Sequence, residues 1–306
     1  MQENTWLTDR FEDNRSRLRA VAYRMLGSLS EADDAVQETW LRLSRADTND
    51  VSDLTGWLVT VTGRVCLDML RHRRSRREDS VGVHLPDPIV DRADGLDPEN
   101  QILLANSVGI ALLVVLDTLD PAERLAFVLH DMFGLPFEEI ANVVGKSPAA
   151  TRQLASRARR RVQGSPTVPD ADIGRQREVV NAFFAAAREG NFDALVSLLD
   201  PNVVLRADAG EMPEGTSREV HGAAAVAGQA LTFRRVGAAS WGGTSPSVQP
   251  ALVNGVAGVV VLREGAPQVV FAFTVSSGKI AAIDIISDAE RLRRLDVAGS
   301  LSITEG

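Results

Sequence analysis

Residues 137–161 read FEEIANVVGKSPAATRQLASRARRR, and this stretch predicts two helices joined by a three-residue turn. Gly145 ends the first helix, while Ser147 and Pro148 supply a cap and a first-turn proline for the second. This arrangement is typical of a helix-turn-helix. The apolar residues expected to pack the two helices together are Ile140, Ala141, Val144, Leu154, Ala155 and Ala158.

The second of these helices is strongly basic on its outward face. Between Lys146 and Arg161 the chain has six cations and no acid, although its formal net charge is -8. The N-terminal half of such a helix can reach base edges in a major groove, and its arginines can contact the flanking phosphates. The alternative is an ordinary basic surface helix. The predicted DNA-facing residues are Lys146, Ser147, Ala149, Ala150, Arg152, Gln153, Ser156, Arg157 and Arg160.

A second cluster of cations, Arg71 to Arg77, lies upstream, and an acid-rich stretch from Asp87 to Glu99 separates the two. Cations concentrated at two places in an acidic chain predict a polyanionic partner held at two points, which we interpret as promoter DNA. The composition, 44% apolar and 24% charged over 306 residues, is that of a globular protein with two or three domains.

Cys66 is the only cysteine, so an internal disulfide is excluded, and the four histidines are too scattered to form a metal cluster with it. We expect Cys66 in the core, no metal and no cofactor. The longest apolar run, Val108 to Leu116, is far shorter than the roughly 20 residues of a membrane-spanning helix. The N-terminus has no basic and apolar leader, so we predict a cytoplasmic protein without a membrane partner.

A helix expected after Gly27 has an acidic face opposite its apolar stripe. Asp34, Gln37 and Glu38 project together from that face at i, i+3 and i+4. This geometry suits a basic helix of a partner protein, and solvated surface is the alternative.

The polar stretch from Ala46 to Thr55 predicts a loop, and Trp57 then restarts a helix. The outward positions of this helix carry charged residues and lead into the first arginine cluster. The helix can therefore lie against DNA. Its candidate contact residues are Arg64, Asp68, Arg71, Arg73 and Arg74.

Together these segments resemble two regions of a known family. The motif Ala32-Asp33-Asp34-Ala35-Val36-Gln37-Glu38-Thr39-Trp40-Leu41, followed by Gly56-Trp57-Leu58, resembles region two of bacterial sigma factors of the extracytoplasmic-function group. The stretch Glu139 to Arg159 resembles their region four, and the resemblance covers residues 8–163.

The resemblance implies specific partners for each segment. It places the acidic face of Asp34, Gln37 and Glu38 on the coiled coil of the largest subunit of RNA polymerase. It implies that the 46–55 loop and the helix after it open the -10 element, and that the 147–162 helix reads the -35 element. Because core polymerase supplies the catalysis, no catalytic residue is implied in this half.

After residue 174 the pattern changes to helices followed by β-like runs. Helices are expected within 175–199 and 222–231, and strands near 203–205, 238–241, 251–256, 258–262, 269–275 and 280–286. This order indicates an α+β domain with a curled antiparallel sheet. It resembles the SnoaL-like branch of the NTF2-like superfamily, whose cone-shaped sheet surrounds a pocket.

Enzymes of that branch use an Asp or His in the cavity for acid-base chemistry. Asp208, His221 and Trp241 are the candidates for lining such a pocket here, where a small-molecule ligand would bind. The alternative places Asp208 in a turn and His221 at a helix cap. The sequence contains no clear paired acid and base.

One group of these sigma factors has a SnoaL-like extension and a Trp-Leu-Pro-Glu-Pro linker motif, which His84-Leu85-Pro86-Asp87-Pro88 resembles with His in place of Trp. The extension is implied to control sigma activity within the chain, replacing a separate anti-sigma protein. Two further motifs of the group correspond to Asp208-Ala209-Gly210-Glu211 and Asp288-Ala289-Glu290-Arg291-Leu292. The implied regulatory residues are Leu85, Pro86, Asp87, Pro88, Asp208, Gly210, Arg291 and Leu292.

The predicted protein is multi-domain, with two all-α DNA-binding helical domains and an α+β SnoaL-like domain. The expected boundaries are 1–78, a linker at 79–104, 105–163, a linker at 164–173, and 174–306. The leading function is a non-enzymatic promoter-specificity subunit of RNA polymerase. Two alternatives are a helix-turn-helix regulator with a ligand-sensing domain, and a SnoaL-like isomerase or hydrolase fused to a DNA-binding module.

Overall fold

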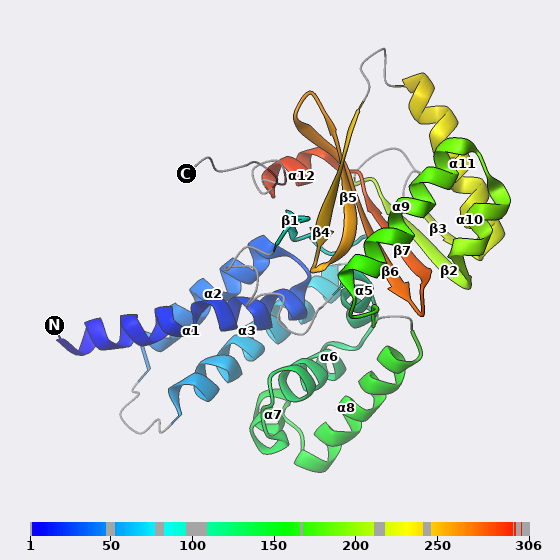
Figure 1. Ribbon diagram of the computed structural model, residues 1–306. Helices are drawn as coiled ribbons and strands as arrows, with labels where there is room; N and C mark the ends of the chain where they lie inside the picture. The colour runs from blue at the N-terminus through cyan, green and yellow to red at the C-terminus, as the bar shows by residue number, and fades with distance from the viewer. Residues whose placement is uncertain are drawn as a thin grey trace. The chain divides into compact units, whose positions relative to one another are not determined.

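The computed structural model describes residues 2–46, 53–76, 83–95, 109–165, 168–210, 218–240, 246–295, 297 and 301 (Figure 1). The chain divides into two compact units. The helical unit comprises Met1–Ser80, Pro98–Asn106 and Leu113–Ser165. The C-terminal unit comprises Val81–Asp97, Ser107–Leu112 and Pro166–Gly306, so most of the predicted linker between the DNA-binding regions belongs to it.

Three helices form the first half of the helical unit: α1 (Gln2–Leu26), α2 (Leu29–Leu43) and α3 (Leu54–Arg76). Gly27 adopts a φ of 72° between the first two, because the chain reverses there through a left-handed conformation that glycine tolerates. Apolar faces of all three helices meet in one core, and Cys66 lies fully buried in it. The prediction that Cys66 is a core residue is confirmed.

The second half contains α5 (Ile110–Asp117), α6 (Pro121–Phe127), a π-helical turn η1 (Val128–Met132), α7 (Phe137–Val144) and α8 (Pro148–Gln163). Gly145 has a φ of 68°, and the Ser147 hydroxyl accepts a hydrogen bond from Ala150 N at 3.2 Å. The helix-turn-helix is therefore confirmed, including the six predicted packing residues, all of which are buried. The π-helical turn was not predicted.

The two halves of the helical unit pack closely, because α3 lies against both α6 and α7. Gly63 permits the approach: a Cβ atom there would lie 2.9 Å from Leu129 Cδ1 and 3.1 Å from Leu125 Cδ1. Nearby, the buried Arg24 places its guanidinium 5.2 Å from the ring centroid of Phe133. The two expected DNA-binding regions thus contact each other through α3, α6 and α7.

The C-terminal unit is an α+β domain, as predicted. Its helices are α9 (Ile173–Glu189), α10 (Phe192–Leu198), α11 (Ala223–Ser240) and α12 (Ala289–Arg294). Its strands are β1 (Val90–Arg92), β2 (Leu199–Asp208), β3 (Arg218–His221), β4 (Ser247–Val253), β5 (Val256–Arg263), β6 (Ala266–Ser276) and β7 (Lys279–Ile286). They form one sheet in the order β1-β4-β5-β6-β7-β2-β3.

Two expectations for this sheet were wrong. The sheet is mixed rather than antiparallel, because β2 pairs in parallel with β7. The strand expected near 238–241 is instead the end of α11, since the helix that begins at Ala223 continues to Ser240. Trp241 lies outside the described residues.

Three tight turns connect the last four strands. Asn254-Gly255, Glu264-Gly265 and Ser277-Gly278 have positive φ at both positions, with values of 51° and 75°, 52° and 79°, and 53° and 72°. This backbone matches the twist of antiparallel neighbours and requires residues that tolerate positive φ. Helix α9 packs on one face of the sheet, where it contacts β5, β6 and β7 (Figure 1). Rings from Phe183, Phe184, Phe271 and Phe273 pack together there.

Within the described residues, no helix combines the length and the apolar character needed to cross a bilayer.

Candidate linker-binding site and nucleic-acid interface

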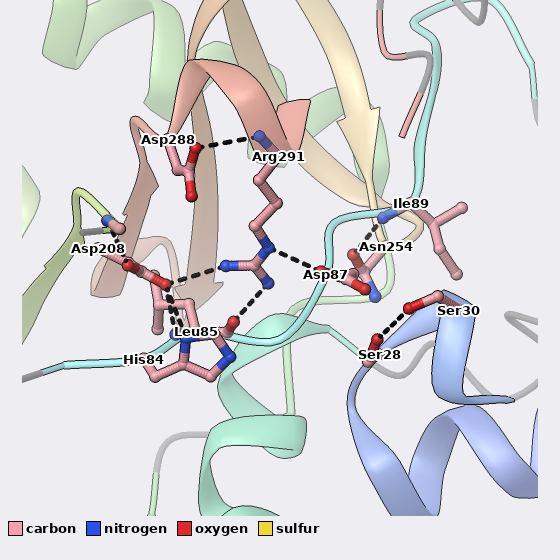
Figure 2. Close-up of polar contacts among 11 residues, drawn as sticks. Ser28, Ser30, His84, Leu85, Asp87, Ile89, Asp208, Asn254, Asp288 and Arg291 are labelled. Carbon is pink, nitrogen blue, oxygen red and sulfur yellow. Dashed lines mark hydrogen bonds and ion pairs between the residues drawn. The ribbon is translucent and has the colours of Figure 1, made fainter. Parts of the chain in front are cut away.

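A buried arginine in the C-terminal unit holds the linker. Arg291, in α12, donates from Nε to Asp87 Oδ1 at 2.7 Å and from Nη2 to the Leu85 carbonyl at 2.6 Å. Its Nη1 donates to Asp208 Oδ2 at 3.0 Å, at the end of β2 (Figure 2). All three charged side chains are buried, with exposed fractions of 6% for Arg291, 7% for Asp87 and 2% for Asp208.

Burial of these charges requires many hydrogen bonds, because a buried ion pair repays its desolvation only when its remaining polar atoms are also satisfied. Asp208 meets this requirement. Its Oδ2 also accepts from Leu85 N at 2.8 Å, and its Oδ1 accepts from Gly210 N at 3.0 Å. His84 Nδ1 lies 3.5 Å from the same Oδ2, although its ring is mostly exposed. The carboxylate therefore binds the linker directly through the Leu85 amide, and indirectly through Arg291, which binds Asp87 and the Leu85 carbonyl.

The linker then enters the sheet. β1 pairs antiparallel with β4, with Val90 opposite Val253 and Arg92 opposite Ala251. The buried Asn254 fixes the approach to this strand, because its Oδ1 accepts from Ile89 N at 3.0 Å and its backbone N donates to Ile89 O at 2.7 Å. Main-chain hydrogen bonds of this kind supply affinity for an added strand.

The structure brings together most of the residues proposed to be regulatory. Leu85, Asp87, Asp208 and Arg291 share the network, and Gly210 closes the turn beside it. Gly210 needs to be glycine, because its φ is 65° and a Cβ there would collide with the Asp288 carboxylate. The remaining members, Pro86, Pro88 and Leu292, are buried.

Asn254 is the functional residue that the sequence reasoning missed. Its available signal was the Asn-Gly dipeptide between two β-like runs, which favours a hairpin turn. That signal accounts for the turn but not for the hydrogen bonds to Ile89, a residue 165 positions away.

The candidate pocket residues do not form the predicted constellation. His221 is exposed at the end of β3, where its Nε2 lies 3.3 Å from Glu219 Oε1. With a side chain that is 69% exposed, His221 is not enclosed by the described residues, and its role in lining a cavity stays a prediction. Asp208 lies in the linker network, where both of its carboxylate oxygens accept hydrogen bonds.

The predicted DNA-facing residues of α8 lie at its surface, and several of their arginines form ion pairs. Arg152 is 2.9 Å from Glu138, and Arg157 is 2.9 Å from Glu123. The Arg152–Glu138 pair is exposed and contributes about 0–1 kcal/mol, so a phosphate can replace Glu138 at little cost, whereas Glu123 is only 7% exposed. The basic face of α8 thus remains suited to DNA.

On α3 the candidate residues are similarly engaged. Arg64 Nη2 donates to the Asn142 carbonyl at 3.3 Å, and Arg71 lies 3.9 Å from Asp68. Arg73 pairs with Glu31. Arg74 is 2.9 Å from Asp120 at the start of α6, an exposed contact between the two halves of the helical unit. No local sequence signal indicates these pairings.

The acidic face of α2 is accessible as predicted. Asp34 and Gln37 are exposed, and the half-buried Glu38 is 3.0 Å from Arg42 one turn later.

Comparisons with known proteins agree with this arrangement. The family model of Sigma-70 region 2 matches residues 10–76, and that of Sigma-70, region 4 matches residues 110–162. The ECF RNA polymerase sigma factor SigJ of Mycobacterium tuberculosis is 40% identical over 291 residues, which are 92% of this chain and 91% of the relative. The probable ECF RNA polymerase sigma factor SigI of the same species is 35% identical over 276 residues, 89% and 90% of the two chains.

The similarity extends to three dimensions. The crystal structure of the Mycobacterium tuberculosis extracytoplasmic function sigma factor SigJ superposes with a TM-score of 0.74 at 38% identity. The match covers 94% of this chain and 98% of that one, including the C-terminal unit. The chain therefore belongs to the extracytoplasmic-function family of RNA polymerase sigma factors.

Proposed function

We propose that the C-terminal unit controls this sigma factor in cis by holding the linker between its two DNA-binding regions. As a member of its family the chain binds core RNA polymerase and directs transcription initiation, and the proposal concerns how that activity is controlled. The observation that carries it is the buried network in which Arg291 binds Asp87, the Leu85 carbonyl and Asp208.

Docking restricts the chain between the two regions. From Leu85 to Arg92 the linker is held by the Arg291 network, by Asn254 and by β-pairing. The -35 and -10 elements lie about 25 base pairs apart, or roughly 85 Å at ~3.4 Å per base pair. Helices in contact, as α3 is with α6 and α7, do not span that distance on straight DNA. Initiation therefore requires the two regions to separate.

The linker supplies this separation when it is free to extend. Binding of core polymerase, or of a small-molecule ligand in the C-terminal unit, would favour the undocked state if it binds that state more tightly. In this scheme the C-terminal unit takes the place of a separate anti-sigma factor.

Contacts with the other partners follow from the exposed surfaces. We propose that α8 reads the -35 element through the DNA-facing residues named above, and that α3 contacts the -10 element. The exposed Asp34 and Gln37, with Glu38, would bind the coiled coil of the largest polymerase subunit.

A matched pair of variants tests the regulatory role. Arg291→Leu removes the central cation, whereas Arg293→Leu changes an exposed arginine of the same helix. Run-off transcription with core polymerase would be measured on promoters mapped with the wild-type protein. We expect Arg291→Leu to change transcript yield several-fold and Arg293→Leu to leave it unchanged. Equal yields from wild type and Arg291→Leu would refute control through the linker.

A further inference from the structure

A cleft opens in the helical unit where the end of α3 meets the loop before α6. Its volume is about 390 Å³, and four arginines line it together with two aspartates, Asp117 and Asp120. Arg73 and Arg74 come from α3, Arg124 from α6 and Arg161 from α8. Arginines from both halves of the helical unit therefore line the cleft.

The two aspartates are already engaged in the protein. Asp120 Oδ1 accepts from Ala122 N at 3.1 Å as the cap of α6, and its Oδ2 faces Arg74. Asp117 Oδ1 accepts from Arg124 Nη1 at 3.0 Å. Glu31 and Glu123, which pair with Arg73 and Arg161, are not among the residues that line the cleft. The lining thus has more positive than negative charge.

Arg124 gives the second indication that an anion is needed. Its side chain is only 2% exposed, and burial lowers its pKa. Nε donates to the Arg24 carbonyl at 3.3 Å and Nη1 to Asp117, but Nη2 has no hydrogen-bond acceptor among the described residues. A buried cation with an unpaired donor is costly, and the negative charge of an anion held in the cleft that Arg124 lines would offset part of that cost.

We propose that this cleft binds a phosphate-bearing anion, either an inorganic polyphosphate or the phosphate chain of a nucleotide. Arginine is the side chain best suited to this chemistry, because its planar guanidinium donates two parallel hydrogen bonds to one phosphate. The cleft volume of about 390 Å³ lies within the range of small-molecule sites.

The bound anion would bridge the DNA-binding regions. Because Arg73 and Arg74 lie on the helix proposed to contact the -10 element, the anion also competes with DNA for them. It therefore favours the closed helical unit, independently of whether the C-terminal unit regulates the protein.

The test measures binding of sodium tripolyphosphate to the full chain by isothermal titration calorimetry at constant ionic strength. Arg161→Gln and Arg74→Gln each remove one cation from the cleft. Arg159→Gln is the control, because Arg159 lies on the same helix, is not among the predicted DNA-facing residues and does not line the cleft. Folding is checked by thermal unfolding without the anion; Glu123 keeps Arg157 as a partner when Arg161 is replaced.

We expect the Kd for tripolyphosphate to rise about tenfold in each cleft variant, which corresponds to one lost charge-assisted hydrogen bond. The control should change it less than twofold. A titration with ATP distinguishes the two ligands. Equal affinities for ATP and tripolyphosphate identify the phosphate chain as the recognised group, and tighter binding of ATP identifies a nucleotide. Absence of saturable binding, or equal losses in Arg159→Gln and Arg161→Gln, would overturn the proposal. The proposal would also be overturned if Arg74→Gln and Arg161→Gln weakened binding of a duplex DNA probe but not of tripolyphosphate.

Discussion

Replacing Asn254 by glycine removes one hydrogen bond of the docked linker, the bond from Ile89 N to Asn254 Oδ1. Glycine retains the backbone N–H that donates to Ile89 O and tolerates the φ of 51°, but it lacks the Oδ1 that accepts from Ile89 N. Ile89 and Asn254 are both buried, so the amide of Ile89 loses its acceptor in an environment with little access to water.

The expected cost follows from that burial. A buried donor left unsatisfied costs about 1–3 kcal/mol, equivalent to a ~5- to 150-fold shift in the equilibrium between docked and undocked linker. Native-state hydrogen exchange, read at the amide of Ile89, should accelerate by a factor in that range. Asn254→Ala should accelerate it further, because alanine at positive φ adds roughly 1–2 kcal/mol of strain.

Glu264→Gly is the matched control. Glu264 occupies the equivalent position of the next hairpin, with a φ of 52°, and is followed by Gly265 as Asn254 is by Gly255. It should leave the exchange rate of Ile89 unchanged. If Asn254→Gly and Glu264→Gly give the same rate as wild type, the side chain of Asn254 does not hold the linker, and the reasoning from its burial is wrong.

Four other experiments, three substitutions and one chemical modification, probe the two units. Gly63→Leu should lower the stability of the helical unit by about 1–3 kcal/mol in thermal unfolding, because its side chain would enter the space of Leu125 and Leu129. Gly228→Ala in α11, where a Cβ meets no atom within 4 Å, should instead raise stability by roughly 0.5–1 kcal/mol, and the same sign for both would contradict this account. Burial raises the pKa of Asp284 despite its pairing with Arg206, so the folded state binds this proton more tightly than the unfolded state. Stability relative to Asp284→Asn should therefore fall as pH rises from about 4, and a pH-independent difference in Tm would show that Arg206 cancels the cost of burial. Cys66 is fully buried and burial raises the pKa of its thiol to about 12, so native protein should react with a thiol reagent much more slowly than unfolded protein; equal rates would place Cys66 in contact with solvent.

Much of the helical unit could be predicted because its signals are local. The cap at Ser147, the left-handed Gly145 and the apolar spacing of α7 and α8 act over four residues or fewer, so they can be read in order along the chain. The same reasoning located most strands of the C-terminal unit. It failed at 238–241, where the continuation of α11 outweighs a short apolar run.

The linker site could be predicted only in part. Motif resemblance identified Leu85, Asp87, Asp208 and Arg291 as a group, but nothing local indicates that a single guanidinium joins them. Arg291 reaches Asp87 across 204 positions, and Ile89 reaches Asn254 across 165. Nor does the sequence indicate that the linker becomes an edge strand, because any β-like segment can pair with any free edge.

The helix-turn-helix, the two basic helices and the family could be inferred from the amino-acid sequence, because caps, periodicity and motif spacing depend on neighbours in the chain. The folded structure was needed to find which acid faces each arginine, that the linker pairs with β4, and that α3 packs against α6 and α7. These contacts join residues far apart in sequence. Their free energy depends on burial and on distances of about 3 Å, which arise only once the chain has folded.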